Sequence, residues 1–378
     1  MTPGDIHAAS EPIYPYVPFA GALVWNRSQA DSSPVKIHVS FSPDWFAAQM
    51  GLDMSERWHT DPFLRRDSFA AMARAMNAAF PGLRLGGDPD TIRGGLSQIA
   101  NCAPVGALFG QEVLYSSGGW PENNRRLLDD QAADALAVPD FQSGPFFSGL
   151  MRQMDVIQEE WGAIDGELNY QGVLNTAFRL RGEHIFTDMV TAPERAHHVL
   201  DVVCETTMRF ADAVYERQSR SGVSRDYFVT SNCVVNMISE DHYRQFVMPY
   251  DRRLSAHYPH FGVHNCGWKV DAYAKAYSEI RALGYLDFGI QSDLEALKLL
   301  FPRTVLTVIL NPDDVIGRTA AEVRATLEKL RDSLKVCRIL LGALDGRTKS
   351  AEVEAFFSAT AETWGVPVER LVPRPHFG

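Results

Sequence analysis

The chain has little of what marks several large classes of protein. Its 378 residues include only 5 cysteines, scattered and without a C-x-x-C pair, so we expect no disulfide framework and a reducing compartment. Basic residues are outnumbered by acidic ones, 36 to 47, which argues against a nucleic-acid partner or an anionic membrane surface. No apolar run approaches the roughly 18 residues of a membrane span, and the N-terminus has no secretory pattern. We therefore expect a soluble cytoplasmic protein.

Several catalytic and nucleotide-binding motifs are absent as well. The sequence has no P-loop, no G-x-S-x-G and no G-x-G-x-x-G after its first predicted strand. It shows no internal repeat and no low-complexity segment. Hydrophobic residues make up 46% of the chain, enough for one large core at this length.

The first part of the chain is irregular. Residues 1–35 carry prolines and aromatic residues without periodicity, and we expect them to wrap the outside of the main body. The apolar alternation over residues 36–41 predicts a strand, and apolar residues recur at helical spacing over residues 69–80. We assign residues 1–82 to an N-terminal extension with entry helices and residues 83–378 to a barrel, within one structural domain.

From Gly172 onward, short apolar runs alternate with amphipathic helices. Three of these helices open at predicted capping boxes, Thr191–Glu194, Ser292–Glu295 and Thr319–Glu322. The apolar, β-branched run Val305–Leu310 suits a strand buried on both faces. Such alternation predicts an α/β fold with parallel strands. Given the length and the missing dinucleotide fingerprint, a closed (β/α)8 TIM barrel is favoured over a doubly wound sheet.

The segment Phe261–Gly267 is the most specific pattern in the chain. Its apolar lead-in ends in His264-Asn265-Cys266-Gly267, and the period of two along a strand puts His264 and Cys266 on one face. An imidazole nitrogen beside a thiol is half of a zinc site. The glycine allows the chain to turn sharply afterwards. We interpret His264 and Cys266 as metal ligands.

Other candidate site residues also lie near predicted strand ends, where the active sites of such barrels are found. Gln291 and Asn311 end adjacent strands and are candidates for catalytic hydrogen bonds to a polar substrate. Candidates for substrate contacts are Trp268, Asn265 within the motif itself, and Glu112 in the run Ala107–Val113, which predicts a strand and a turn.

The second half of the chain resembles the uroporphyrinogen decarboxylase superfamily. The resemblance covers roughly residues 105–365. Its motifs, in chain order, include Leu180-Arg181-Gly182, Ala192-Pro193-Glu194-Arg195-Ala196-His197, Ile238-Ser239-Glu240-Asp241-His242-Tyr243, His264-Asn265-Cys266-Gly267 and Asn311-Pro312. It implies a (β/α)8 barrel with a cleft at the C-terminal ends of the strands.

Two functional branches of that superfamily are distinguishable. The tetrapyrrole decarboxylases share an arginine-rich N-terminal segment that grips substrate carboxylates; this chain lacks it, and an arginine-poor entry is a poor clamp for a polycarboxylate. The corrinoid-dependent methyltransferases use His-x-Cys-Gly for zinc, while cobalamin on a partner protein carries the methyl group. The resemblance to this branch implies zinc, a small-molecule substrate and a corrinoid protein as partner. A homodimer is the assembly we consider.

One position departs from the pattern of that branch. Its third zinc ligand is a cysteine after a glycine at the end of the next-to-last strand, where this chain has Gly342 followed by Ala343. Cys337 lies at the start of that strand, well over 10 Å from the mouth at about 3.3 Å per residue. Two substitutes remain open, Cys233 at the mouth end of an earlier strand and Asp345 in the altered loop. Loss of the metal is a third option.

The leading expectation is a zinc-assisted methyltransferase that moves a methyl group between a small substrate (methyl ether, amine or thiol) and a corrinoid protein. Because the chain has no D-x-H-x-x-G module, the corrinoid must arrive on a partner. The alternative is a decarboxylase-like lyase that acts on a small or tetrapyrrole carboxylic acid without metal. A third hypothesis is a degenerate barrel that carries a corrinoid or another ligand.

Overall fold

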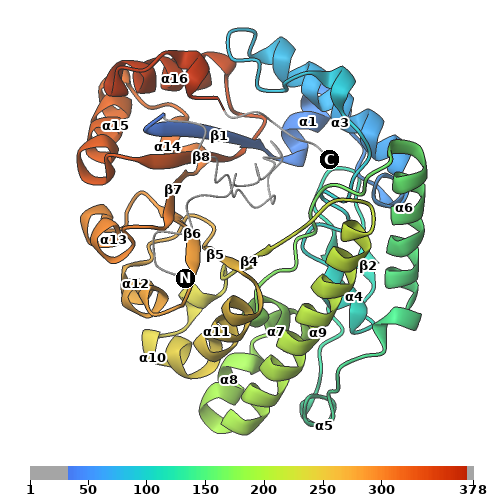
Figure 1. The fold of residues 1–378 in the computed structure, drawn as a ribbon. Helices are drawn as coiled ribbons and strands as arrows, with labels where there is room; N and C mark the ends of the chain where they lie inside the picture. The colour runs from blue at the N-terminus through green and yellow to red at the C-terminus, as the bar shows by residue number, and fades with distance from the viewer. Residues whose placement is uncertain (1–32, 373–378) are drawn as a thin grey trace.

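The computed structural model describes residues 33–372, and the expectation for residues 1–35 falls almost entirely outside this range (Figure 1). Six parallel strands form one sheet in the order β1-β8-β7-β6-β5-β4, so the first strand lies beside the last. The strands are β1 Val35–Phe41, β4 Tyr227–Ser231, β5 His260–His264, β6 Leu283–Gly289, β7 Val305–Leu310 and β8 Cys337–Leu344. The strand predicted over residues 36–41 is confirmed.

Beyond β4, at the edge of the sheet, residues 165–172 continue the barrel wall without forming a regular strand. Gly95 and Asp165 pair in an isolated parallel bridge. The segment after Asp165 contacts both ends of β4. Tyr227 at the start of β4 donates its hydroxyl to Glu167 at 2.8 Å. At the other end of β4, a Cβ added to Gly172 would lie 2.2 Å from the Ser231 carbonyl oxygen, so only glycine fits there. The predicted α/β fold of the (β/α)8 TIM-barrel type is thus confirmed, with six parallel strands in its main sheet.

Helices surround the sheet (Figure 1). Before β4 they are α1 Pro43–Met50, α2 Glu56–Thr60, α3 Pro62–Ala79, α4 Pro104–Leu108, α5 Asp130–Asp134, α6 Pro145–Trp161, α7 Val173–Arg181, α8 His184–Thr191 and α9 Pro193–Ser219. After β4 they are α10 Glu240–His242, α11 Met248–His257, α12 Asp271–Ser278, α13 Leu294–Leu300, α14 Pro312–Val315, α15 Ala320–Leu334 and α16 Ser350–Trp364. A π-helical turn, Tyr243–Val247, joins α10 to α11. None of the helices described is long and apolar enough to cross a membrane.

The strand predicted over residues 107–113 is not found. The run Ala107–Val113 is not a strand: Pro104 starts the short helix α4 there, and only Val113 and Leu114 pair as β2, with β3 (Glu122–Asn123). Proline at the first helical position favours a helix, and the apolar run concealed that signal.

The capping box Thr319–Glu322 is confirmed at α15. The helix predicted to open at Thr191 starts after Ala192, which makes no side-chain cap, and the helix predicted to open at Ser292 is capped one residue later by Asp293.

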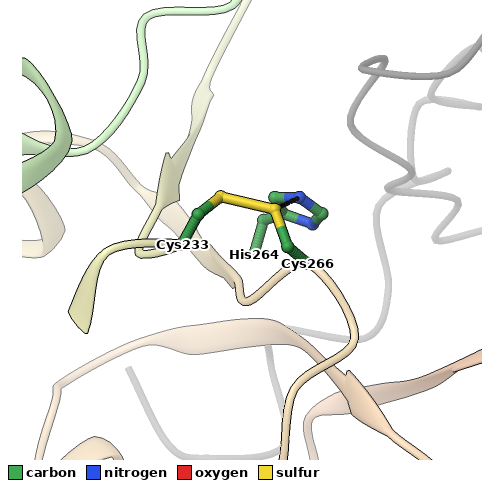
Figure 2. A group of neighbouring side chains, drawn as sticks. All are labelled: Cys233, His264 and Cys266. Carbon is green, nitrogen blue, oxygen red and sulfur yellow. Dashed lines mark hydrogen bonds between the residues drawn. A yellow bond between two sulfur atoms is a disulfide. The ribbon is translucent and has the colours of Figure 1, made fainter. Parts of the chain in front are cut away.

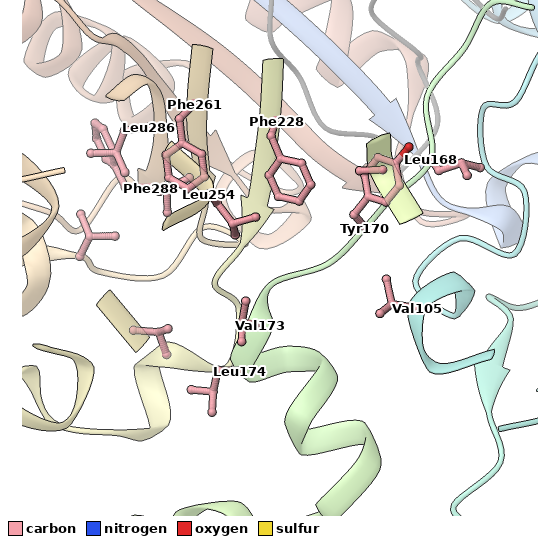
Figure 3. Close-up of a cluster of buried hydrophobic side chains, with 14 of the residues drawn as sticks. Val105, Leu168, Tyr170, Val173, Leu174, Phe228, Leu254, Phe261, Leu286 and Phe288 are labelled. Carbon is pink, nitrogen blue, oxygen red and sulfur yellow. The ribbon is translucent and has the colours of Figure 1, made fainter. Parts of the chain in front are cut away.

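The core lies between the sheet and the helices. Phe228 of β4 stacks on Tyr170 and on Tyr258, with ring centroids 5.6 Å and 5.0 Å apart. Figure 3 shows Phe228 and Phe261 on neighbouring strands with Leu254 of α11 beside them. Because these side chains face the helices, the alternate residues of the same strands face the barrel interior. That interior set includes Ser231, His264 and Asp287, which stand at the C-terminal ends of β4, β5 and β6.

Candidate metal centre and its cavity

Three predicted metal ligands meet where β4 and β5 end. Cys233, His264 and Cys266 each offer one ligand atom, and these three atoms lie within 4.8 Å of one another. Figure 2 shows the three side chains pointing toward a common place. The strand register explains the meeting: Ser231, the last residue of β4, pairs with His264, so Cys233 emerges beside the His-x-Cys turn.

The two cysteines of this group are joined by a disulfide, with Cα atoms 5.6 Å apart. Cys102, Cys204 and Cys337 are free, and the Cys233–Cys266 disulfide departs from the expectation drawn from the scattered cysteines. His264 Nε2 lies 3.1 Å from Cys266 Sγ. Two thiolates and one imidazole are a donor set that zinc prefers, and the set leaves a fourth position for another ligand. The residues therefore fit zinc, provided that the cysteines are reduced, because a disulfide sulfur is not a thiolate ligand.

The turn after β5 requires unusual backbone. Cys266 has φ 50° and Gly267 has φ 77°, both in the left-handed region. A non-glycine residue held there costs on the order of 1 kcal/mol, and such residues concentrate at functional sites. A Cβ on Gly289 of β6 would lie 2.0 Å from the Gly267 carbonyl oxygen, so the two glycines permit the close approach of turn and strand. The sharp turn predicted at Gly267 is confirmed.

A buried polar network lies behind Cys233. Asn232 donates to Asp251 at 2.8 Å, and the Tyr243 hydroxyl donates to the same carboxylate oxygen at 2.8 Å. Asp251 is fully buried, and burial raises the pKa of its carboxyl from 3.8 to about 6. The network fixes the residue that precedes Cys233 and so limits where its thiol points.

The three ligand candidates lie in the wall of a cavity of about 740 Å³. One face of α7 forms another wall with Asn175, Phe178 and Arg179, which are spaced at i, i+3 and i+4. Asn175 accepts a hydrogen bond from the Val234 backbone N–H at 3.0 Å, which pins α7 against the turn that follows Cys233. The cavity and the metal-ligand group are therefore one site.

Several cavity residues have polar groups that the described protein leaves unused, among them Arg179, Ser231 and the side-chain oxygens of Asn123 and Asn124. The Arg179 side chain is half-buried, and its guanidinium forms no ion pair or hydrogen bond with residues 33–372. The Ser231 hydroxyl is buried and has no partner in the same range. Of these two groups, the half-buried Arg179 guanidinium is available to a substrate. The carboxylates in the lining, Glu122 and Glu183, are exposed.

The other predicted site residues lie around this centre rather than in it. Asp345 forms an ion pair with Arg347 at 2.7 Å, which holds the pKa of the Asp345 carboxyl below its usual range. Gln291 and Asn311 are exposed and do not line the cavity, although Asn311 lies beside Gly267 of the turn and Gln291 beside Gly289 of β6. Of the two proposed substitutes for the third ligand, the structure brings Cys233, not Asp345, to His264 and Cys266.

The three predicted substrate-contact residues also lie outside the cavity lining. Asn265 is fully buried and is used by the protein itself, donating to the Asp287 carbonyl oxygen at 2.8 Å and accepting from Tyr277 at 2.9 Å. Trp268 packs edge-on against Tyr273 with ring centroids 5.3 Å apart. Glu112 is exposed beside β2. Cys337 is buried at the start of β8, as predicted for a core cysteine, and burial raises the pKa of its thiol to about 12.

Sequence reasoning missed several residues of the site. Ser231, Asn175 and Arg179 are cavity residues that no short motif marks. Asp287 belongs to no motif identified in the sequence, yet it contacts His264. A lone carboxylate inside the apolar run of β6 was the available signal, because a buried charge without a partner is costly.

Comparisons with known proteins agree with the fold. The family model described as uroporphyrinogen decarboxylase (URO-D) matches residues 101–338. Among solved structures, a methyltransferase from Methanosarcina mazei superposes with a TM-score of 0.61 at 15% sequence identity, covering 94% of this chain and 96% of that chain. At this identity the likeness shows a shared fold. The curated proteins contain no match.

The network behind Cys233 predicts a pH dependence of stability. Since the folded pKa of Asp251 is raised, the folded state keeps its proton between about pH 4 and pH 6 while the unfolded state has lost it. Stability should therefore fall as pH rises through this window, by an amount on the order of 2–3 kcal/mol. Asp251→Asn cannot titrate. Urea unfolding of both proteins at pH 4, 5, 6 and 7 should show a stability difference that changes across the window; a constant difference would contradict the prediction.

Proposed function

The chain belongs to the uroporphyrinogen decarboxylase family, and from that premise we propose that it is a methyltransferase with a zinc centre held by Cys233, His264 and Cys266. The proposed reaction moves a methyl group between a small substrate and a corrinoid protein. The observation that carries the proposal is the convergence of three metal-ligand side chains on one cavity at the strand ends. Catalytic groups occupy this end of the strands in barrels of this type.

The proposed ligand set compensates for the alanine at the family's expected third position. Ala343 is exposed on β8, whereas Cys233 reaches the other two ligands from β4. When bound, zinc would lower the pKa of a substrate thiol and hold it as the anion. A set with two thiolates is softer than one completed by Asp345, and this favours a thiol over an ether or amine among the substrates considered.

The remaining cavity residues would bind and orient the substrate. Phe178 supplies an apolar wall, and Asn175 of the same helix adds a polar side chain beside it. The cavity, of about 740 Å³, is in the range of small-molecule sites. We propose that the corrinoid reaches the mouth of this cavity on a partner protein.

Metal content tests the proposed centre. Protein purified without chelator and kept reduced with a phosphine should contain about one zinc per chain. Cys233→Ser and Cys266→Ser should each lose most of it, because serine is a poor zinc ligand. Cys102→Ser is the matched control, since Cys102 lines the same cavity outside the ligand group. It should keep its zinc.

The outcomes of that measurement separate the open alternatives. Zinc retained in Cys233→Ser would contradict this ligand set and return Asp345 to consideration. A wild-type protein without zinc would contradict the methyltransferase proposal as a whole. Protein oxidised before loading should bind little zinc, because the disulfide occupies both sulfurs.

A second candidate function is a metal-independent lyase that acts on a small carboxylic acid. The observation that favours it is Arg179, a half-buried guanidinium without an ionic partner in the described chain, facing the cavity. Arginine binds carboxylates through paired hydrogen bonds. One interior arginine suits a single carboxylate better than the many carboxylates of a tetrapyrrole.

The lyase alternative predicts acid binding without metal. A panel of small carboxylic acids, screened by thermal shift in the presence of EDTA, should stabilise the protein, and a bound acid should release carbon dioxide. Arg179→Gln should weaken binding by about 10- to 100-fold, the value of a charge-assisted hydrogen bond. Arg125→Gln is the control, because Arg125 is exposed on the same cavity. Absence of binding, or equal binding in Arg179→Gln, would contradict this alternative.

A further inference from the structure

His264 is held on both of its ring nitrogens. Nε2 lies 3.1 Å from Cys266 Sγ, on the side of the ligand group. Nδ1 lies 2.6 Å from Oδ2 of Asp287 on the neighbouring strand β6. The imidazole therefore spans the space between a buried carboxylate and the two sulfurs, and its ring plane is set by both contacts.

Asp287 is itself held rigidly. It is fully buried, and its oxygens accept hydrogen bonds from the Asn265 backbone N–H at 2.7 Å and from the Tyr285 hydroxyl at 2.9 Å. Its one ion-pair partner among residues 33–372 is His264, with no arginine or lysine near enough to pair with it. Burial of a carboxylate is costly unless it is hydrogen-bonded. The hydrogen bonds from Asn265, Tyr285 and His264 offset the cost of burying the Asp287 carboxylate.

The inward face of β6 supports the whole turn. Tyr285, Asp287 and Gly289 alternate along the strand and so point to the same side. Tyr285 fixes Asp287, Asp287 fixes His264 and the backbone of Asn265, and Gly289 donates its N–H to the Trp268 carbonyl oxygen at 3.0 Å. Strand β6 thus contacts His264 and Asn265 within the turn and Trp268 directly after it.

We propose that Asp287 is a positioning residue that orients His264 so that Nε2 faces the metal, with Tyr285 and Gly289 as the rest of its support. Histidine ligands of metals commonly donate their second N–H to a carboxylate, which fixes ring orientation and strengthens the ligand. The inference rests on the proposed zinc centre and adds a residue that touches neither the metal nor the substrate.

The test is the zinc dissociation constant of the reduced full-length protein, measured by competition with a chromophoric chelator. Asp287→Asn should bind zinc about 10- to 100-fold more weakly than wild type. Asp188→Asn is the matched control, because it also removes a buried carboxylate, but one that pairs with Arg181 and Arg195 and contacts none of the three ligand residues. Its zinc affinity should stay within about threefold of wild type, although its stability changes.

Two further readouts separate positioning from general damage. The cobalt-loaded Asp287→Asn protein should show an altered visible spectrum, because the imidazole is misplaced, while the melting temperature of its metal-free form reports folding. Tyr285→Phe keeps the carboxylate and removes one of its donors; it should weaken zinc binding by a smaller factor, about 2- to 10-fold. Tyr285→Phe decides the question if Asp287→Asn does not fold.

The results that would contradict the role of Asp287 differ from those that would contradict the zinc centre. Unchanged zinc affinity in folded Asp287→Asn, or in Tyr285→Phe when the first variant is unfolded, would overturn the positioning role and leave the zinc centre intact. Equal weakening in Asp188→Asn would overturn it as well, by assigning the loss to the removal of any buried carboxylate. A wild-type protein that binds no zinc would instead overturn the proposed function.

Discussion

The candidate site depends on the parallel pairing of β4 with β5. Their register sets Ser231 opposite His264, and Cys233, separated from Cys266 by 33 residues in sequence, is thereby delivered to the His-x-Cys turn. In a strand, a slip of one residue sends every side chain to the opposite face. A slip here would turn His264 toward the helices and Phe228 or its neighbours toward the interior. The packing of Phe228 against Tyr170 and Tyr258 therefore protects the geometry of the site.

The same constraint accounts for the departure at Ala343. β5 lies between β4 and β6 in the sheet, and β8 lies two strands beyond β6. A third ligand from β4 comes from an immediate neighbour of the His-x-Cys strand. In the proposed centre the metal would thus be held on the β4 side, next to α7 and the cavity residues Asn175 and Arg179. The substrate would then approach between α7 and the strand ends.

The sequence predicts a large part of this arrangement. The α/β barrel follows from the alternation of apolar runs and capped helices, and the pairing of His264 with Cys266 follows from the period of two along a strand. The sequence alone does not decide whether Cys233 or Asp345 is the third ligand candidate, because both lie near strand ends. The order of the strands in the sheet decides it, since β4 is the neighbour of β5. Gln291 and Asn311 follow their strands closely, yet they point outside the cavity lining.

Other residues were beyond sequence reasoning for a different reason. Asn265 is polar and lies between two ligand candidates, but its side-chain amide is hydrogen-bonded to Asp287 and Tyr277. These partners lie on other elements, so the sequence around Asn265 does not reveal them. Asp287 is hidden in an apolar strand, and its importance lies in a contact 23 residues away along the chain. Arg179 belongs to a helix face whose exposure to the cavity is set by the bond between Asn175 and Val234.

Zinc K-edge X-ray absorption on the reduced, zinc-loaded protein tests the central claim most directly, because it counts the sulfur ligands. The account predicts two sulfur scatterers at about 2.3 Å, with nitrogen or oxygen at about 2.0–2.1 Å completing the shell. The imidazole of His264 should also contribute its outer-shell scattering. A single sulfur would contradict it, since Cys233 and Cys266 could not then both be bound to the metal.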